Sequence, residues 1–396
     1  MSMLSRRRST GVGGGHVRSL VETACVLARE HNVFVVEQGT FFPIALRRQL
    51  ELSGVKFVHM PMSLASLYRT PRRLSHFFRL EHIDLISCVG QFSDIFPYLA
   101  AKDNGDTRLI VTKCGGPNSP WYLNETNLIV YSKEDHDYYL AAGVPNVWHC
   151  ANRASHPRSN PTGIGILKNQ HPGHILMRIC RIDGTYDHTV LQGARLAREL
   201  AKTHELSYVV IGKADGEDRL RQLEAVTRRL YPRTFFLSDP QFTTDAATLI
   251  EAATYVIGTG RGFMEAASLQ KLMFCPVNSK DIPMFIDPKS YDTAFSCNFS
   301  GRAEFSDEEI RSGLLRCSSL SKSAESRSQY QEWISYKFEQ DFCSEVLPDF
   351  YERIRDCALP LRPKPIKSLI HRALKVYGFC YMPSSVANFA KRVLRR

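Results

Sequence analysis

The sequence contains no run of about 18 apolar residues, the length that a helix needs to cross a bilayer, so no transmembrane helix is expected. Its first eight residues lack the apolar core of a signal peptide. The eleven cysteines never come closer than 14 positions, which excludes a Cys-x-x-Cys pair for a metal or a redox disulfide. Isolated cysteines within apolar runs are typical of core residues in a reducing compartment. These absences predict a cytoplasmic protein.

Acidic residues are missing from one end of the chain. Residues 359–396 contain nine Lys or Arg and no Asp or Glu, whereas the whole chain has a net charge of +11. The remainder therefore carries only +2 (11 − 9), which does not indicate nucleic-acid binding, and no nucleic-acid partner is predicted. The cationic, aromatic-bearing tail is predicted to lie on an anionic membrane surface. The alternative is a basic helix that packs back on the first domain.

What is present is the composition of a soluble globular protein with two or more domains, 396 residues with 43% hydrophobic and 23% charged. Short β-branched runs alternate with helical patterns, which predicts an α/β protein with parallel sheets. In the first half, strands are expected at residues 33–36, 55–59, 83–87, 109–112 and 128–131. In the second half, they are expected at residues 175–179, 208–211, 234–237, 255–257 and 273–276.

No convincing strand precedes Gly11. Either irregular residues replace the first strand of the sheet, or the polypeptide begins late. A proline-bearing stretch without a long apolar run, residues 153–173, is interpreted as a linker between two domains.

The most informative stretch is 253–272. A buried strand is expected to end near Gly258, followed by a loop with Gly260 and Gly262 and a short helix that carries Glu265. Closely spaced glycines let the backbone approach a ligand, and the start of a helix suits a phosphate. A carboxylate one turn into that helix can accept hydrogen bonds from the diol of a ribose. The alternative is an ordinary strand-to-helix turn with a solvated glutamate.

Six segments within a region of roughly 11–300 are informative together: residues 13–16, 131–134, 143–145, 151–153, 177–183 and 251–277. In their order and spacing they resemble retaining family-four glycosyltransferases of the glycosyltransferase-B fold. The resemblance implies two Rossmann-like parallel-sheet domains that face a cleft, with a helical, basic C-terminal extension. The implied domains are an acceptor-side domain (1–152), the linker (153–173), a nucleotide-sugar-binding domain (174–300), C-terminal helices (301–357) and a basic amphipathic tail (358–396).

The resemblance also implies roles for single residues. Arg181 stands at the family's phosphate-binding arginine, and Glu265 at the second glutamate of its Glu-x7-Glu motif. A guanidinium can bind phosphate oxygens bidentately and stabilise charge on a leaving diphosphate without a metal. Residues predicted to contact the donor are Glu265, Gly260, Arg261, Gly262, Gly14 and Gly15. Predicted catalytic residues are Arg181, Lys213 and Lys113, and no metal site is expected.

Each of these side chains also has a plainer interpretation. Lys213 and Lys113 follow expected strands, where a lysine could bind phosphate or remain solvated. His16 is a weak candidate base beside the glycine turn, and Cys114 is interpreted as a packed thiol because no partner histidine is indicated.

The chain departs from the family at three places. Ile257 replaces the first glutamate of Glu-x7-Glu, Tyr186 replaces a lysine, and residues 111–117 lack the first-domain histidine. These losses affect the expected sugar contacts more than the nucleotide contacts.

The implied function is transfer of a sugar from a nucleotide-sugar, UDP- or GDP-linked, to a glycan or lipid-linked acceptor in surface polysaccharide biosynthesis. The implied enzyme is retaining, needs neither metal nor further cofactor, and is peripheral on the inner face of the plasma membrane. The alternatives are a nucleotide-sugar epimerase of the same architecture and a catalytically degenerate scaffold that binds a partner or a membrane.

Overall fold

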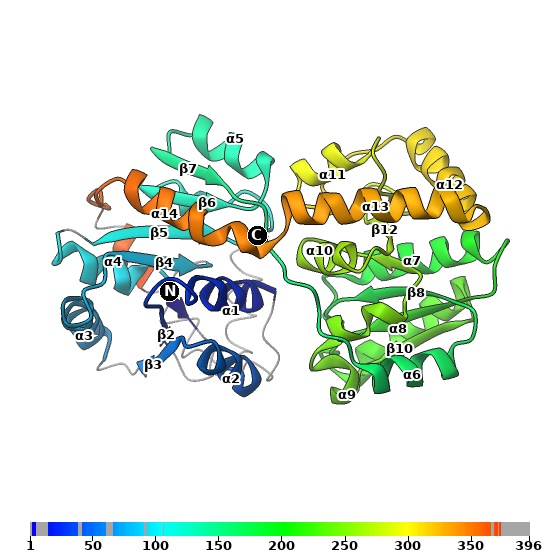
Figure 1. Ribbon diagram of the computed structural model, residues 1–396, viewed down its shortest axis with the longest axis horizontal. Helices are drawn as coiled ribbons and strands as arrows, with labels where there is room; N and C mark the ends of the chain where they lie inside the picture. The colour runs from blue at the N-terminus through cyan, green and yellow to red at the C-terminus, as the bar shows by residue number, and fades with distance from the viewer. Residues whose placement is uncertain are drawn as a thin grey trace. The chain divides into compact units, whose positions relative to one another are not determined.

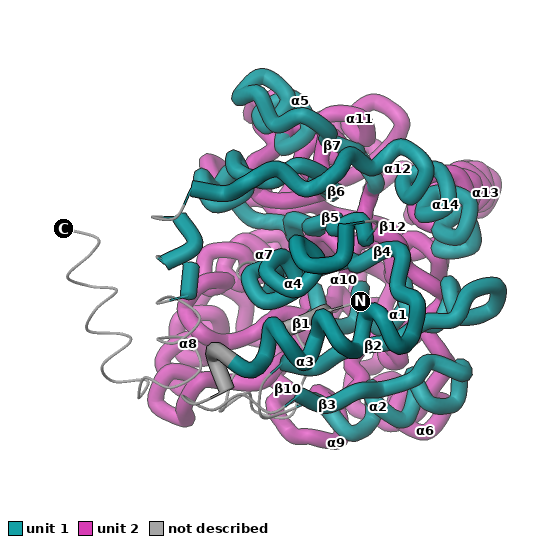
Figure 2. The backbone as a smooth tube through the Cα atoms, turned by 90° about the vertical axis from the view of Figure 1, so that its left-hand side faces the viewer, with its two compact units in different colours: residues 1–131, 135–150, 344–396 teal, residues 132–134, 151–343 magenta. Residues whose placement is uncertain are grey.

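The computed structural model describes residues 2–4, 15–38, 42–60, 66–90, 93–105, 107–365, 368–370 and 372–373. The chain divides into two compact units, coloured separately in Figure 2. Unit 1 consists of residues 1–131, 135–150 and 344–396, and unit 2 consists of residues 132–134 and 151–343. Each unit is built on a parallel sheet with helices between its strands (Figure 1), which confirms the predicted α/β class.

The sheet of unit 1 has seven parallel strands in the order β3-β2-β1-β4-β5-β6-β7. The strands are β1 (Ser2–Leu4), β2 (Phe34–Gln38), β3 (Lys56–Met60), β4 (Leu85–Val89), β5 (Arg108–Lys113), β6 (Asn127–Val130) and β7 (Asn146–His149). The helices are α1 (Gly15–Leu27), α2 (Ile44–Leu52), α3 (Ser66–Leu80), α4 (Ile95–Lys102), η1 (Pro120–Tyr122), most of α5 (Lys133–Ala141), η3 (Ser344–Val346) and α14 (Leu347–Cys357).

A first strand is present, contrary to the expectation from sequence. β1 pairs in parallel with β2 from Ser2 opposite Val36 to Leu4 opposite Gln38, and Ser2 also lies opposite Cys88 of β4. Only three residues of β1 pair, which is too short a run to give a recognisable strand pattern in the sequence. β1 therefore occupies the centre of the sheet, where the strand order reverses.

A cavity of about 540 Å³ opens at the amino ends of the unit 1 strands. It is bordered by Phe34 of β2, Leu85 of β4 and Tyr351 of α14. None of the predicted site residues borders it. Because ligands of doubly wound sheets bind at the carboxyl ends of the strands, this cavity is not the candidate site.

The sheet of unit 2 has six strands in the order β10-β9-β8-β11-β12-β13, with only β13 antiparallel. The strands are β8 (His174–Ile179), β9 (Leu206–Ile211), β10 (Thr234–Leu237), β11 (Tyr255–Ile257), β12 (Leu272–Cys275) and β13 (Met284–Phe285). The helices are α6 (Pro161–Gln170), α7 (Asp187–Leu200), α8 (Glu217–Leu230), α9 (Pro240–Thr243), η2 (Ala246–Ala252), α10 (Arg261–Ser268), α11 (Tyr291–Ser296), α12 (Asp307–Lys322) and α13 (Ala324–Asp341).

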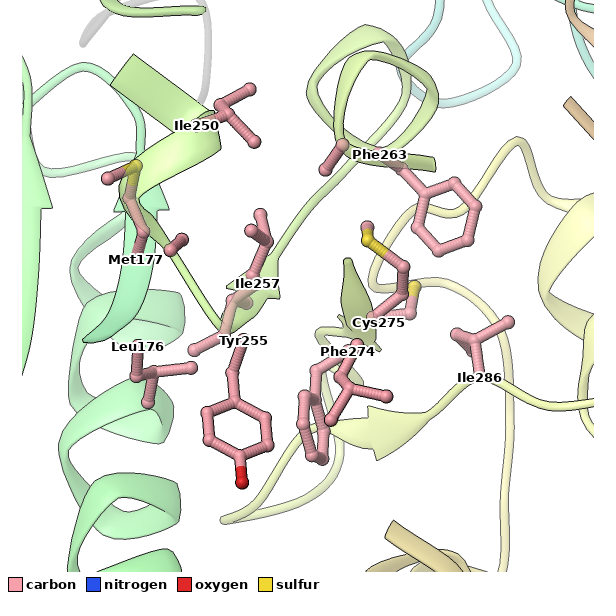
Figure 3. Packing of buried hydrophobic residues seen from close by; sticks show 14 of the residues in the cluster. Leu176, Met177, Ile250, Tyr255, Ile257, Phe263, Phe274, Cys275 and Ile286 are labelled. Atoms are coloured by element: carbon pink, nitrogen blue, oxygen red, sulfur yellow. The ribbon is translucent and has the colours of Figure 1, made fainter. Parts of the chain in front are cut away.

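One continuous hydrophobic core supports the unit 2 sheet on both faces. Figure 3 shows its centre, with Ile257 of β11 lying between Met177 of β8 and Cys275 of β12. Phe263 extends the core into α10 and is fully buried. The loop between β11 and α10 therefore starts and ends at residues that packing holds in place.

The stretch interpreted as a linker contains a helix of unit 2. α6 begins at Pro161, and Asn160 caps it by accepting a hydrogen bond from the backbone N–H of Gly163 at 3.0 Å. Ile164 and Leu167 of α6 are buried in the core of unit 2. Proline fits the first position of a helix as well as it fits a loop, so proline content does not distinguish a linker from the start of α6.

The segment after α14 packs within unit 1 and contributes two cations to a buried ion cluster. Lys364 Nζ lies 2.7 Å from an oxygen of Asp94 and 2.7 Å from an oxygen of Glu125. A guanidinium nitrogen of Arg372 lies 2.6 Å and 2.7 Å from oxygens of the same two carboxylates. All four side chains are at most 4% exposed. Burial by itself would raise the pKa of Asp94, but the two cations hold this pKa below its usual value.

Lys364 and Arg372, two of the nine cations in the predicted membrane-binding tail, are therefore buried in ion pairs. For the described part of the tail, the alternative of packing on the first domain is the one observed. Residues 374–396, which complete the predicted basic tail, lie outside the described residues. Within the described ranges, no helix is both long enough and apolar enough to cross a membrane.

Lys364→Met is expected to lower the free energy of unfolding by about 3–5 kcal/mol, because it leaves two buried carboxylates with one cation. The measurement is urea unfolding of the full chain followed by circular dichroism. Arg362→Met is the matched control, since Arg362 is an exposed cation two positions away and should change the free energy by less than about 0.5 kcal/mol. Equal unfolding midpoints for the two variants would contradict a stabilising cluster.

His171, which follows α6, has a buried imidazole ring without a hydrogen-bond partner in the described part of the chain. It is 4% exposed, its ring centroid lies 4.2 Å from that of Phe235, and both ring nitrogens are unpartnered. Burial, followed by the charge of Arg233, lowers its pKa from the ordinary value of 6.5. The folded state therefore holds this imidazole neutral at pH values where the unfolded chain binds a proton.

The consequence is a loss of stability below about pH 6.5 that His171→Leu should remove. As the pH falls through the unfolded value, the unfolded state gains a proton that the folded state does not accept, so the wild type loses stability. The free energy of unfolding, measured between pH 7 and pH 5, should fall less steeply in His171→Leu than in the wild type. His188→Leu, which changes an exposed histidine of α7, is the control. Parallel pH profiles for wild type and His171→Leu would refute this assignment.

Candidate functional site

The strand order of unit 2 reverses between β8 and β11, which are neighbours in the sheet. β9 lies on the far side of β8, and β12 lies on the far side of β11. In doubly wound sheets this point forms a crevice for ligands at the carboxyl ends of the strands. Arg181 follows β8, Lys213 follows β9, and the segment from Gly258 to Glu265 follows β11. The structure therefore brings the predicted residues of unit 2 to one edge of one sheet.

Gly258, Gly260 and Gly262 of the loop differ in whether the structure requires glycine. A Cβ at Gly258 would lie 2.6 Å from the Cα of Phe263, so only glycine lets the loop pack against α10. Gly260 has φ 49° and ψ −125°, a conformation that side chains other than hydrogen rarely allow. At Gly262 a Cβ would meet no atom within 4 Å. Gly262 is therefore not required by packing and leaves space beside the first turn of α10.

Glu265 is held by Arg261 across one turn of α10. The Nε of Arg261 donates to an oxygen of Glu265 at 2.7 Å, and the two side chains are 14% and 11% exposed. Arg261 also donates to the backbone oxygen of Arg153 at 3.3 Å. The pair fixes the direction of the Glu265 carboxylate, so Arg261 has a positioning role in addition to the predicted donor contact.

Arg181 is an exposed cation at this edge. Its side chain is 67% exposed, lies 3.2 Å from Asp183 and places its guanidinium carbon 5.7 Å from the ring centroid of Tyr186. Cations are attracted to the face of an aromatic ring at this distance. Tyr186, which stands where the family has a lysine, therefore positions an arginine instead of supplying a second cation.

A second arginine, Arg178 in β8, was not singled out from the sequence. It is 1% exposed, and its guanidinium donates to the backbone oxygen of Ile257 at 3.0 Å and to Thr189 Oγ1 at 3.3 Å. Its guanidinium carbon lies 5.8 Å from the same Tyr186 ring. Among the described residues no carboxylate pairs with it. Its charge therefore adds a positive potential beneath the loop where an anion would bind.

The only sequence signal for Arg178 is a charged residue inside an otherwise apolar strand. A charged group is rarely buried in such a position without a specific role. Its contact with the last residue of β11 depends on the sheet order, which the sequence pattern does not give.

Lys113 of unit 1 is buried, contrary to its expected position as an accessible cation. Its Nζ lies 2.8 Å from Asp135 and donates to the backbone oxygens of Gly115 and Gly116 at 3.3 and 2.9 Å. The side chain is 1% exposed. This geometry favours a structural role, in which Lys113 fastens the loop after β5 to α5. The neighbouring Cys114 behaves as a packed thiol, since burial raises its pKa to about 12.

The glycine turn of unit 1 is only partly described. Gly15 and His16 are exposed at the first turn of α1, whereas Gly14 lies outside the described residues. A Cβ at Gly15 would meet no atom within 4 Å. The described ranges contain no group of three or more His, Cys, Asp or Glu side chains placed to hold a metal ion.

Solved structures share this two-unit architecture. A glycosyltransferase from Rickettsia africae superposes with a TM-score of 0.62 over 89% of this chain and 97% of its own, at 13% sequence identity. HepE from Anabaena, in complex with UDP, gives a TM-score of 0.62 over 90% of this chain and 100% of its own, at 15% identity.

The chain has the glycosyltransferase-B fold. This confirms the two Rossmann-like parallel-sheet domains that the sequence resemblance implied. A Listeria monocytogenes protein provisionally assigned as a UDP-N-acetylglucosamine 2-epimerase also matches, with a TM-score of 0.51 and 12% identity over 89% of this chain and 94% of its own. No protein-family model and no curated protein matches the sequence. At these sequence identities the solved structures establish the fold alone.

The glycine loop gives a matched pair of substitutions. Gly258→Ala is expected to destabilise unit 2 by about 1–3 kcal/mol, because the new Cβ would overlap the backbone of α10. Gly262→Ala is expected to leave stability unchanged or to raise it by up to about 1 kcal/mol, since it replaces glycine within a helix in open space. Chemical unfolding of both variants provides the measurement. An equally large loss in Gly262→Ala would show that the loop is packed differently.

Proposed function

We propose that this chain is a glycosyltransferase that uses a nucleotide-sugar donor bound at the carboxyl edge of the unit 2 sheet. The observation that carries the proposal is that Arg181, Gly262 and Glu265 all lie where the strand order reverses. There is open space beside Gly262, and Arg261 orients the Glu265 carboxylate. The proposal is supported by the fold that this chain shares with a glycosyltransferase and with HepE, whose solved structure contains UDP.

Each part of the donor has a matching group. The start of α10 and the guanidinium of Arg181 offer hydrogen-bond donors and positive charge to a diphosphate. The Glu265 carboxylate can accept the two hydroxyl protons of the ribose. Lys213, exposed after the neighbouring strand, is proposed as a second cation at the diphosphate. UDP and GDP are both compatible with these contacts.

In the proposed reaction, the bond between the sugar and the diphosphate oxygen breaks, and a bond to the acceptor oxygen forms on the same face with retention. The acceptor proton moves to the leaving diphosphate. Arg181, Arg178 and the α10 dipole stabilise the charge that develops there, and no metal is assigned a part. Preorganised positive charge favours the transition state because the diphosphate is more negative there than in the donor.

The acceptor is proposed to be a glycan or a lipid-linked glycan of surface polysaccharide biosynthesis, reached from a peripheral position on the membrane. Two features support attraction to an anionic surface. The sequence of residues 374–396 contains five cations and no acidic residue. In unit 1, Arg69, Arg72, Arg73 and Arg79 are exposed on α3, a helix without a carboxylate.

An epimerase that acts on a nucleotide-sugar is the second candidate, favoured by the Listeria structure of the same fold. The two activities differ in their products. A transferase releases a nucleoside diphosphate only as sugar reaches an acceptor or water, whereas an epimerase converts the donor without an acceptor. A scaffold would bind a nucleotide and leave it unchanged.

Glu265→Gln tests the donor site. UDP or GDP at about 100-fold above its Kd should stabilise the wild type by about 2.7 kcal/mol, a rise of about 5–10 °C in Tm. The shift should be much smaller in Glu265→Gln, whose amide is a weaker acceptor for the ribose hydroxyls. A thermal-shift panel with UDP, GDP, ADP and CMP provides the measurement. Glu325→Gln, which alters an exposed carboxylate of α13, is the control and should respond as the wild type does.

The outcomes separate the candidates. If no nucleotide changes the melting curve at millimolar concentration, the donor-site assignment is wrong. If a nucleotide binds equally well to wild type and Glu265→Gln, the site lies elsewhere. Chromatography of the donor after incubation without an acceptor distinguishes an epimerised sugar from an intact one.

A further inference from the structure

The turn that ends α11 lies against the glycine loop. Asn298 follows α11 with φ 54°, and the backbone N–H of Phe299 donates to the oxygen of Ala294 at 2.7 Å. This is the helix-ending pattern in which a left-handed residue, usually glycine or asparagine, closes the last turn. Phe299 also has positive φ, at 49°, which is unusual for a bulky residue and costs free energy. The turn is therefore held in place by its surroundings.

Packing against α10 holds the turn. The ring of Phe299 stacks on that of Phe263, with centroids 3.7 Å apart and planes at 8°. This contact brings the carboxamide of Asn298 to the loop before α10. A Cβ built on Gly260 would lie 3.7 Å from Asn298 Nδ2. Asn298 thus adjoins the residue from which α10 starts, within the proposed donor site.

The carboxamide of Asn298 has no partner in the described structure. Asn298 is 8% exposed, and its Oδ1 is buried without a hydrogen bond. A buried acceptor left without a hydrogen bond destabilises the folded state. The left-handed turn does not require this side chain, because glycine adopts the same backbone conformation readily. The position therefore carries a polar group that neither the turn nor the packing uses.

We propose that Asn298 binds a hydroxyl of the sugar in the nucleotide-sugar donor and contributes to the choice of that sugar. The unpartnered Oδ1 requires a hydrogen-bond donor, which a sugar hydroxyl supplies and an ionised phosphate does not. The position of the family's first glutamate is taken by Ile257, which is 1% exposed in β11 and offers no polar group. Asn298 supplies a sugar contact from another element. The inference rests on the proposed function.

The test compares Asn298→Gly with the wild type by isothermal titration calorimetry of the full chain. Glycine keeps the left-handed turn and removes the side chain that bears the carboxamide. The probes are UDP with UDP-glucose, and GDP with GDP-mannose. In Asn298→Gly, affinity for the nucleotide-sugar should fall about 3- to 10-fold, the effect of one neutral hydrogen bond, while affinity for the bare nucleoside diphosphate should stay within about twofold.

Gln270→Gly is the matched control. Gln270 also has positive φ, at 55°, but is exposed beyond the end of α10, so its replacement tests the backbone effect alone. It should bind both kinds of ligand as the wild type does. Asn298→Asp, which keeps the turn and an acceptor oxygen, should retain more of the preference for nucleotide-sugar over bare diphosphate than Asn298→Gly does.

Three results would overturn the inference. Equal weakening of both ligands in Asn298→Gly would assign Asn298 to the loop or the nucleotide, and unchanged binding of both would assign it no ligand contact. In both of these cases the proposed function still stands, provided that the wild type binds a nucleoside diphosphate. A wild type that binds neither kind of ligand removes both the inference and the proposed function. Thermal melting of Asn298→Gly near that of the wild type establishes that the variant is folded.

Discussion

The candidate site of unit 2 depends on the buried guanidinium of Arg178. It joins β8, where it resides, to the last carbonyl of β11 and to Thr189 at the start of α7. These are the elements that meet where the strand order reverses, so one side chain fixes the ends from which the loops of the site begin. Because no carboxylate among the described residues neutralises it, the same group favours an anion above it. Structural and electrostatic roles are combined in one residue.

In the described part of the chain, cations that are paired with carboxylates inside a unit differ from cations that lie exposed at a strand end. Lys113 and Lys364 are paired with carboxylates and fasten a loop and the C-terminal segment to unit 1. Arg181 and Lys213 are exposed at the carboxyl edge of unit 2. A buried pair contributes mainly by not leaving a charge unsatisfied, whereas an exposed cation at a strand end remains able to bind a ligand. Lysine is thus a structural residue where it is buried in a pair, and a candidate ligand contact where it is exposed at a strand end.

The sequence was a good guide where a local pattern was sufficient. The strands at Tyr255–Ile257 and Thr234–Leu237 lie where the sequence predicts them. It failed where a signal was short or ambiguous. β1 pairs over three residues only, and Pro161 begins a helix although proline also marks loops. In the site, the pattern placed Glu265 in the helix after the glycine loop, and it predicted Arg261 as a donor contact but not as the partner of Glu265.

The sequence by itself determined the α/β class and the glycine loop with its following helix, because alternation of apolar residues and backbone freedom are local properties. Tertiary structure decided which charged and polar groups are available to a ligand. It buried Lys113, left Arg181 exposed and brought Asn298 from the end of α11 to Gly260. The physical reason is that burial and pairing arise from contacts between elements distant in the chain. No local pattern encodes those contacts.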